Sequence, residues 1–121
     1  MSIPKRIQER RRAVRIEESV PVKIGHENFE LAVKSVNIST SGALCLVDQD
    51  IPLMTQLRVG VSIPAGYGGH SKPTLIHAKG VVVRKEKDPI SDKYQLAIFF
   101  SDLKAADQAL LKEFVERRLA A

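Results

Sequence analysis

Residues 56–63 read Gln-Leu-Arg-Val-Gly-Val-Ser-Ile, an unbroken alternation in which every second side chain is a branched aliphatic one. Side chains of a β-strand point alternately to opposite faces, so the four aliphatic positions would share one face. These positions are Leu57, Val59, Val61 and Ile63. The other face carries polar or small residues, which suit the solvent side of a sheet. The stretch therefore predicts a half-buried β-strand and favours a β-fold for the chain.

The same two-residue period recurs along most of the chain after residue 20. It predicts further strands at residues 20–24, 29–38, 43–47, 74–84 and 93–100. Within residues 29–38 the alternation slips between Val33 and the pair Val36 and Ile38. A slip of this kind predicts a β-bulge or a sharp bend, and such bends let a small sheet curl into a barrel.

The longest segment without alternation, residues 64–73, contains three glycines and two prolines. Such a composition predicts a flexible hairpin loop between two strands. Its glycines are not followed by Gly-Lys-Ser/Thr or by a helix. The segment therefore does not resemble a phosphate-binding loop.

The period changes to that of a helix at the end of the chain. An apolar stripe with helical spacing runs from Leu103 to Leu119, and charged residues lie off it. Ser101 or Asp102 is expected to cap the start of this helix. The stripe must cover an apolar surface, which an open end or exposed face of a barrel would supply. The sequence thus predicts a mainly β fold, an antiparallel barrel of about six strands with one C-terminal α-helix packed on it.

Charge is distributed unevenly over the 121 residues, a length that suits one domain. Residues 1–15 carry six basic side chains and one acid, so the whole net charge of +5 lies there. We therefore divide the single domain into a basic N-terminal arm, residues 1–19, and a neutral body, residues 20–121. Such a division favours an anionic partner that the arm contacts, although the same composition also fits a solvated tail.

The composition also bears on several classes of protein. No apolar run reaches the roughly 20 residues of a membrane-spanning helix, and the first residues lack the apolar core of a signal peptide. The one cysteine, Cys45, has no histidine near it and is expected in the core. His26, His70 and His77 are scattered, without metal-ligand spacing. These features argue against an enzyme, a metal protein or a membrane protein, and they make the cytoplasm the expected compartment.

Two short motifs are candidates for ligand binding. The first lies in the arm, where Arg10 and Arg11 precede Arg15 and form an Arg-x-x-x-Arg pair. An arginine fork can donate two hydrogen bonds to a phosphate or to the O6 and N7 edge of guanine, and it stacks on flat rings. Alone, the pair carries little weight, because neighbouring arginines are common in basic tails.

The second motif is Asn37-Ile-Ser39-Thr-Ser-Gly42, at the junction of two expected strands. An asparagine can offer an acceptor and donors to a base edge, and a serine hydroxyl can bond a phosphate. A glycine lets a ligand approach the backbone closely. The alternative is an ordinary hairpin in which Asn37 and Ser39 bond their own backbone.

Together the two motifs resemble the signature of the PilZ domain family, Arg-x-x-x-Arg followed by Asp or Asn-x-Ser-x-x-Gly. Residues 78–84, residues 94–100 and the final helix are similar to the later strands and the C-terminal cap of the family. The resemblance implies a six-stranded antiparallel β-barrel that senses the bacterial second messenger cyclic di-GMP. It implies no further cofactor. A domain of this kind needs a downstream protein partner to transmit its signal.

The resemblance also implies roles for individual residues. Arg11 and Arg15 would bind phosphates and guanine edges, Asn37 and Ser39 would contact a guanine from the barrel, and Gly42 would leave room for it. Asparagine replaces the commoner aspartate, which removes a negative charge that attracts guanine N–H donors.

The residue before the first motif arginine has a further meaning in the family. An arginine there, Arg10 in this chain, resembles the version that takes two stacked ligand molecules, and a stacked ligand could link two copies in a dimer. The arm is expected to fold against the barrel when the ligand bridges both motifs.

Two alternatives remain open at this point. A β-barrel that binds nucleic acid would also carry a basic arm, but barrels that hold single strands normally display several aromatic stacking platforms, which are scarce here. A PilZ-like adaptor that binds only proteins typically lacks the intact motifs.

Overall fold

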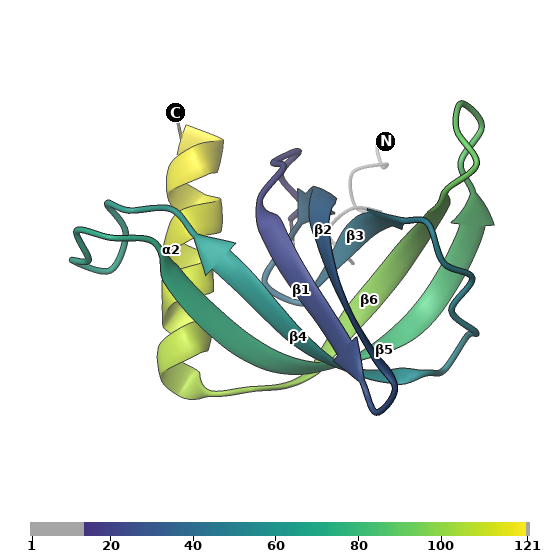
Figure 1. The fold of residues 1–121 in the computed structure, drawn as a ribbon. Coiled ribbons are helices and arrows are strands. Elements are labelled where there is room, and N and C mark those ends of the chain that lie inside the picture. The colour runs from purple at the N-terminus through teal and green to yellow at the C-terminus, as the bar shows by residue number, and fades with distance from the viewer. Residues whose placement is uncertain (1–13, 121) are drawn as a thin grey trace, which may run out of the picture.

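The computed structural model describes residues 14–120, whose strands form a closed barrel with one helix beside it (Figure 1). The strands are β1 (Pro21–His26), β2 (Phe29–Ile38), β3 (Gly42–Val47), β4 (Gln56–Ile63), β5 (Thr74–Lys87) and β6 (Tyr94–Leu103), and the helix is α2 (Ala105–Ala120). Around the barrel the order is β1-β2-β3-β6-β5-β4, and every neighbouring pair is antiparallel. The prediction of a mainly β fold, a six-stranded antiparallel barrel with a packed C-terminal helix, is confirmed.

Aliphatic side chains fill the interior of the barrel. The alternating positions of β4 that the sequence singles out are each at most 4% exposed. The corresponding positions of β6, from Leu96 to Phe100, are also buried. Each such side chain contributes about 1.5–3 kcal/mol relative to an exposed one, so the interior is the main source of stability.

The irregularity predicted in residues 29–38 is a β-bulge in β2. Ser35 pairs with Cys45 and Asn37 pairs with Leu44, so Val36 is an extra residue without a partner across the strand. Val36 was expected on the same face as Ile38, but it is 41% exposed, whereas Ile38 is fully buried. The extra residue of a bulge is turned away from the ladder, and this explains why the expected phase is wrong at Val36.

The segment just before β1 lies along β2. Ile16 exchanges two backbone hydrogen bonds with Ile38, at 2.8 and 2.9 Å. The buried hydroxyl of Ser35 accepts a hydrogen bond of 3.0 Å from the Val20 amide and donates one to the Glu18 carbonyl. The last residues of the expected arm are thus fixed to the barrel. The division of the chain at residue 19 stays a prediction.

Helix α2 covers one part of the barrel beside β4 and β5 (Figure 1). Four of its side chains are buried, and these are Leu110, Leu111, Phe114 and Val115. The helix begins at Ala105, so the predicted cap at Ser101 or Asp102 is wrong. The pairing of β6 with β5 continues to Leu103, and the Ser101 hydroxyl donates to the Lys79 carbonyl instead. No helix within residues 14–120 is long and apolar enough to cross a membrane.

The expected hairpin loop joins β4 to β5, but it packs against α2. Arg117 donates a hydrogen bond of 2.7 Å to the Gly66 carbonyl, and the Glu113 carboxylate accepts one of 3.1 Å from the Gly68 amide. Tyr67 meets Phe114 edge to face at 5.0 Å between ring centroids. These contacts fix the loop to the helix.

Candidate functional site

The structure brings together residues of both predicted motifs. Arg15, Ser39 and Gly42 line one small hollow on the outside of the barrel, beside β3 and β6. Asn37 lies on β2 close by, one residue before Ile38. Arg10 and Arg11 lie outside the residues that the structure describes.

The position of Arg15 is fixed by its neighbour Ile16. The two backbone hydrogen bonds between Ile16 and Ile38 hold this part of the chain beside the turn that connects β2 to β3. Ile16 is 6% exposed, whereas the Arg15 side chain is exposed. Arg15 is also the one charged residue among the described residues that line the hollow, so the hollow favours an anion.

Gly42 has a structural reason to be glycine. It pairs with Phe99 of β6, and a Cβ atom added at Gly42 would clash with the carbonyl oxygen of Ile98. The sequence suggests that Gly42 leaves room for a ligand. The structure shows that it also leaves room for the neighbouring strand, because no side chain fits between β3 and β6 there.

Ser39 is used by its own turn. Its hydroxyl accepts a hydrogen bond of 3.1 Å from the Ser41 amide and lies 3.4 Å from the Gly42 carbonyl, to which it donates. The side chain is 3% exposed. The alternative of a hairpin that bonds its own backbone therefore describes Ser39 correctly, and Ser39 shapes the turn that borders the hollow.

Asn37 is half-buried and pairs with Leu44 across β2 and β3. None of the side-chain hydrogen bonds among residues 14–120 involves the Asn37 amide. Its backbone follows the bulge at Val36, which changes the direction of this end of β2.

Two apolar side chains outside the two predicted motifs border the same hollow. Phe99 is 48% exposed and Val83 is 51% exposed, and both line it. Phe99 alternates with the buried Ile98 and Phe100, so the two-residue period already places it on the outer face. An exposed aromatic ring beside a cation offers a surface on which a flat ring can stack.

The hollow is small compared with known ligand pockets. The hollow has a volume of about 90 Å³, whereas pockets that hold a drug-sized molecule have about 300–1,000 Å³. A dinucleotide is larger than this hollow, so it would also need contacts with residues that do not line it.

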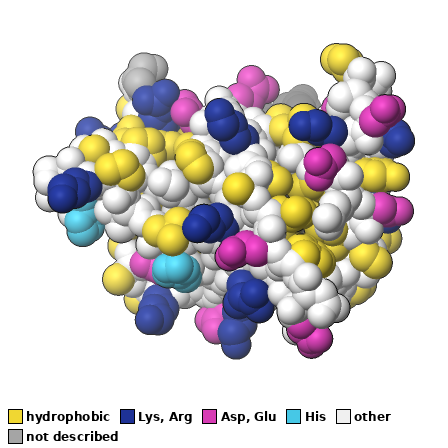
Figure 2. All heavy atoms as spheres, viewed as in Figure 1, with side chains coloured by type: hydrophobic (Ala, Val, Ile, Leu, Met, Phe, Trp, Pro, Cys, Tyr) yellow, Lys and Arg dark blue, Asp and Glu magenta, His cyan; other side chains and the backbone are white. Residues whose placement is uncertain are grey.

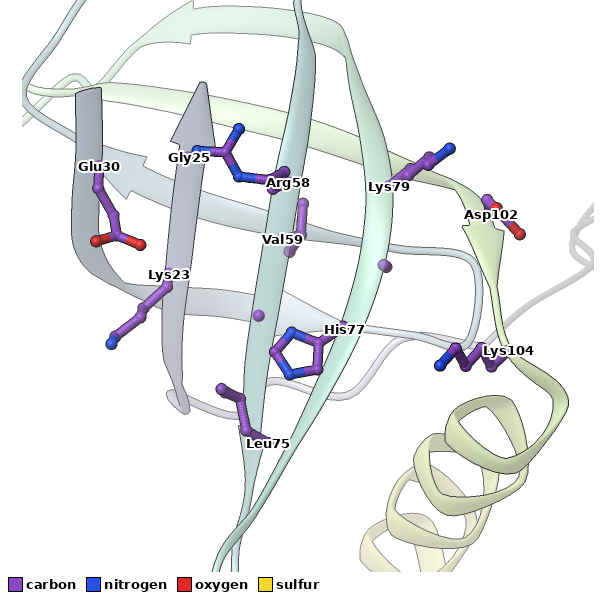
Figure 3. Close-up of a pocket in the computed structure, with 12 residues that line it drawn as sticks. Lys23, Gly25, Glu30, Arg58, Val59, Leu75, His77, Lys79, Asp102 and Lys104 are labelled. Atoms are coloured by element: carbon purple, nitrogen blue, oxygen red, sulfur yellow. The ribbon is translucent and has the colours of Figure 1, made fainter. Parts of the chain in front are cut away.

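A larger hollow of about 480 Å³ lies elsewhere, across β1, β4 and β5 (Figure 3). None of the predicted site residues lines it. Nor do the described residues contain a group of three or more histidine, cysteine or carboxylate side chains arranged to hold a metal ion. Cys45 is fully buried, and this burial raises the pKa of its thiol to about 12, which suits the expected core residue.

Comparison with known proteins gives the following similarities. A PilZ domain family model matches residues 9–117. The structure of MotI/DgrA, the inhibitor of motility of Bacillus subtilis, superposes with a TM-score of 0.77 at 29% identity, over 91% of this chain and 52% of that one. This chain thus spans about half the length of MotI/DgrA.

The PilZ domain of YcgR from Escherichia coli, in a structure with c-di-GMP, superposes with a TM-score of 0.60 at 18% identity. The superposition covers 92% of this chain and 94% of the YcgR chain, and at this identity the likeness concerns the fold. No curated protein sequence matches the chain.

Proposed function

Because the chain belongs to the PilZ domain family, we propose that it is a receptor for cyclic di-GMP rather than an enzyme. The observation that carries this proposal is the hollow that Arg15, Ser39 and Gly42 share, although Gly42 lies far from Arg15 in the sequence. The family match suggests which ligand the chain binds. The hollow is a place that residues of both motifs border.

We assign the ligand contacts from the exposure of each side chain and from its hydrogen bonds within residues 14–120. The exposed guanidinium of Arg15 would bind a phosphate or the edge of a guanine. The side-chain amide of Asn37 would bond a guanine edge. Phe99, exposed beside Gly42, would support a base, because flat rings stack on aromatic faces. Ser39 would act by holding the turn, since its hydroxyl is buried and engaged.

Arg10 and Arg11 complete the proposal from the arm. A cyclic dinucleotide carries two phosphate charges, and the excess positive charge of the chain lies within residues 1–15. Ordering the arm costs about 1–2 kcal/mol per residue, which charge-assisted hydrogen bonds of about 1.5–3 kcal/mol each can offset. We therefore propose that the ligand closes the arm over the hollow, and that a downstream protein recognises the closed form.

Calorimetric titration with cyclic di-GMP tests the receptor proposal. The wild-type chain should bind saturably, Arg15→Ala should lose the binding, and GTP should not replace the ligand. Arg58→Ala is the matched control, because Arg58 is an exposed arginine on β4, away from the hollow. Two equivalents of ligand per chain would agree with the role proposed for Arg10, and one equivalent would contradict it.

Hydrogen exchange tests the closing of the arm. Amides of residues 5–15 should become protected when the ligand binds, while the strands should keep their protection. Equal protection with and without ligand would contradict the proposed movement.

A second candidate function is that of an adaptor that binds only proteins. The likeness to MotI/DgrA, which is named as an inhibitor of motility, makes motility one process that such an adaptor, or the receptor itself, would control. Absence of cyclic di-GMP binding at high micromolar ligand, with the protein folded, would favour the adaptor. For either function we propose the cytoplasm as the compartment.

A further inference from the structure

A shallow groove crosses the outside of β1, β4 and β5 and holds about 480 Å³ (Figure 3). We call it the β1–β4–β5 groove. Four basic and two acidic residues line it, together with one histidine. On the face of the barrel turned to the viewer, Figure 2 shows lysine and arginine side chains with a few acidic ones among them.

The charges of the groove follow an order that the strand register fixes. Five outward positions form one row across five neighbouring strands, and these are Glu30, Gly25, Arg58, Lys79 and Asp102. The row therefore has two adjacent cations in its centre and one acid at each end. With strands about 4.8 Å apart, the two acids are roughly 19 Å from each other along the sheet.

A second row adds positive charge beside the first. Lys23 lies opposite Gly60, and Gly60 lies opposite His77 on the next strand. Lys104, just after β6, points back toward β5 in Figure 3. Because Gly60 has no side chain, the groove is open between Lys23 and His77. The Leu75 side chain is the nearest neighbour of this position.

Arg58 is held in place rather than free in solvent. Its Nη2 donates a hydrogen bond of 3.2 Å to the His26 carbonyl, so the guanidinium extends over β1 (Figure 3). A Cβ atom at Gly25 would lie 2.9 Å from Nη2 of Arg58, closer than real Cβ atoms come. The missing side chain at Gly25 thus leaves room for the guanidinium beside β1, and Arg58 is exposed.

No charged residue of the groove forms an ion pair within residues 14–120, and the nearby Asp107 carboxylate accepts a hydrogen bond of 3.1 Å from the His77 amide. The four ion pairs found among residues 14–120 involve Lys85, Lys112, Arg117 and Arg118 as cations. Neighbouring cations that form no ion pair among the described residues favour an anionic surface from another molecule.

We propose that the β1–β4–β5 groove binds an acidic segment of another protein, with adjacent carboxylates on Arg58 and Lys79 and basic residues near Glu30 and Asp102. A nucleic acid fits less well, because Glu30 and Asp102 would repel a continuous phosphate backbone. In addition, no phenylalanine, tyrosine or tryptophan lines the groove. The groove lies on other strands than Gly42, so this proposal goes beyond the receptor function and does not depend on it.

Nuclear magnetic resonance of the full chain can test the proposal with a defined probe. The probe is an extended peptide of about eight residues, long enough to cross the row, with two central glutamates and a lysine near each end. One neutral residue separates each charged residue from the next, so that all four charged side chains share one face. Saturable shifts are expected at the amides of Gly25, Arg58 and His77. A peptide with the charges inverted, a central lysine pair flanked by glutamates, should bind at least about tenfold more weakly.

Charge-reversal variants give the matched comparison. Arg58→Glu should weaken peptide binding by about tenfold or more, because it places a like charge against the glutamate pair. Lys93→Glu, which makes the same change of net charge at an exposed lysine before β6, should stay within about twofold. Amide spectra and urea unfolding would verify that both variants fold.

Three results would overturn the proposal. They are absence of shifts at millimolar peptide, shifts spread over lysines elsewhere on the surface, and equal weakening by Arg58→Glu and Lys93→Glu. A single-stranded oligothymidylate that shifts the same groove amides at lower concentration than the peptide would assign the groove to nucleic acid instead.

Discussion

Gly42 is needed for the pairing of β3 with β6, apart from the ligand-binding role that we propose for it. Gly42→Ala would push a methyl group against the Ile98 carbonyl, and we expect a loss of about 1–3 kcal/mol in the free energy of unfolding. Urea unfolding measures this loss, and Thr40→Ala in the same turn should change it by less than about 0.5 kcal/mol. If Gly42→Ala kept full stability and lost only ligand binding, the strand contact would not be the reason for the glycine.

Cys45 gives a prediction for alkaline pH. Burial raises its pKa from an ordinary 9.0 to about 12, so the folded chain holds the thiol proton more tightly than the unfolded chain does. The resulting stabilisation is complete below pH 9.0 and is lost as the pH rises toward about 12. Urea unfolding at several pH values should show the wild type losing stability above pH 9.0 faster than Cys45→Val. Parallel curves for the two proteins would contradict the assignment.

At the scale of elements, α2 and the β4–β5 loop stabilise each other. The Glu113 carboxylate accepts a hydrogen bond from the Gly68 amide and another from Arg117, and the first contact is the larger cause of a lowered pKa. Arg117 also lies over the Tyr67 ring, at 4.3 Å from its centroid. The loop is therefore attached through its backbone as well as through its side chains.

This attachment should weaken in acid. Because the pKa of Glu113 is below its ordinary 4.5 in the folded chain, its contribution is present above pH 4.5 and is lost as the pH falls through the folded value. Hydrogen exchange at the Gly68 amide should show protection that decreases in acid, and Glu113→Gln should lower that protection and remove most of its pH dependence. Glu116→Gln is the control, since Glu116 pairs only with Lys112 among the described residues. Protection that is independent of pH in the wild type would contradict this role of Glu113.

At the scale of the whole molecule, the candidate ligand site and the β1–β4–β5 groove occupy different parts of the barrel. Arg15 and Gly42 lie beside β3 and β6, whereas Arg58 lies on β4, across the interior from β3 in the strand order. Substitutions at distant sites without shared partners usually have additive effects.

We therefore expect Arg15→Ala to weaken cyclic di-GMP binding and to leave acidic-peptide binding within about twofold. Arg58→Glu should weaken acidic-peptide binding and leave cyclic di-GMP binding within about twofold. Titration of both single variants and the double variant with each ligand measures the coupling. A coupling larger than about fivefold would mean that the barrel transmits a change from one site to the other.

The elements could be predicted from the sequence because each depends on a local repeat. A strand with one buried face needs an apolar residue at every second position, and this period is readable in residues 56–63 without any knowledge of the partners. The boundaries were less predictable. The helix was expected to start at Ser101 or Asp102, but pairing with β5 extends β6 to Leu103, and that pairing involves residues far away in the chain.

The candidate site was predictable only as a set of residue types. The two motifs indicated arginines and an Asn-x-Ser-x-x-Gly turn, and the structure places Arg15, Ser39 and Gly42 around one hollow. It also shows that Ser39 bonds its own turn and that Phe99 and Val83 border the hollow. The positions of Phe99 and Val83 depend on which strands are neighbours in the barrel. A local sequence pattern does not predict which strands pair.

The sequence by itself determined the class of fold, the strands, the irregularity within residues 29–38 and the uneven charge, because each follows from the order of residues along the chain. Tertiary structure alone decided that Gly25 lies beside Arg58 and that Lys79 and Asp102 continue the same row. The physical reason is barrel closure: pairing β1 with β4 joins segments that are remote in sequence, and the register of that pairing sets which charges meet.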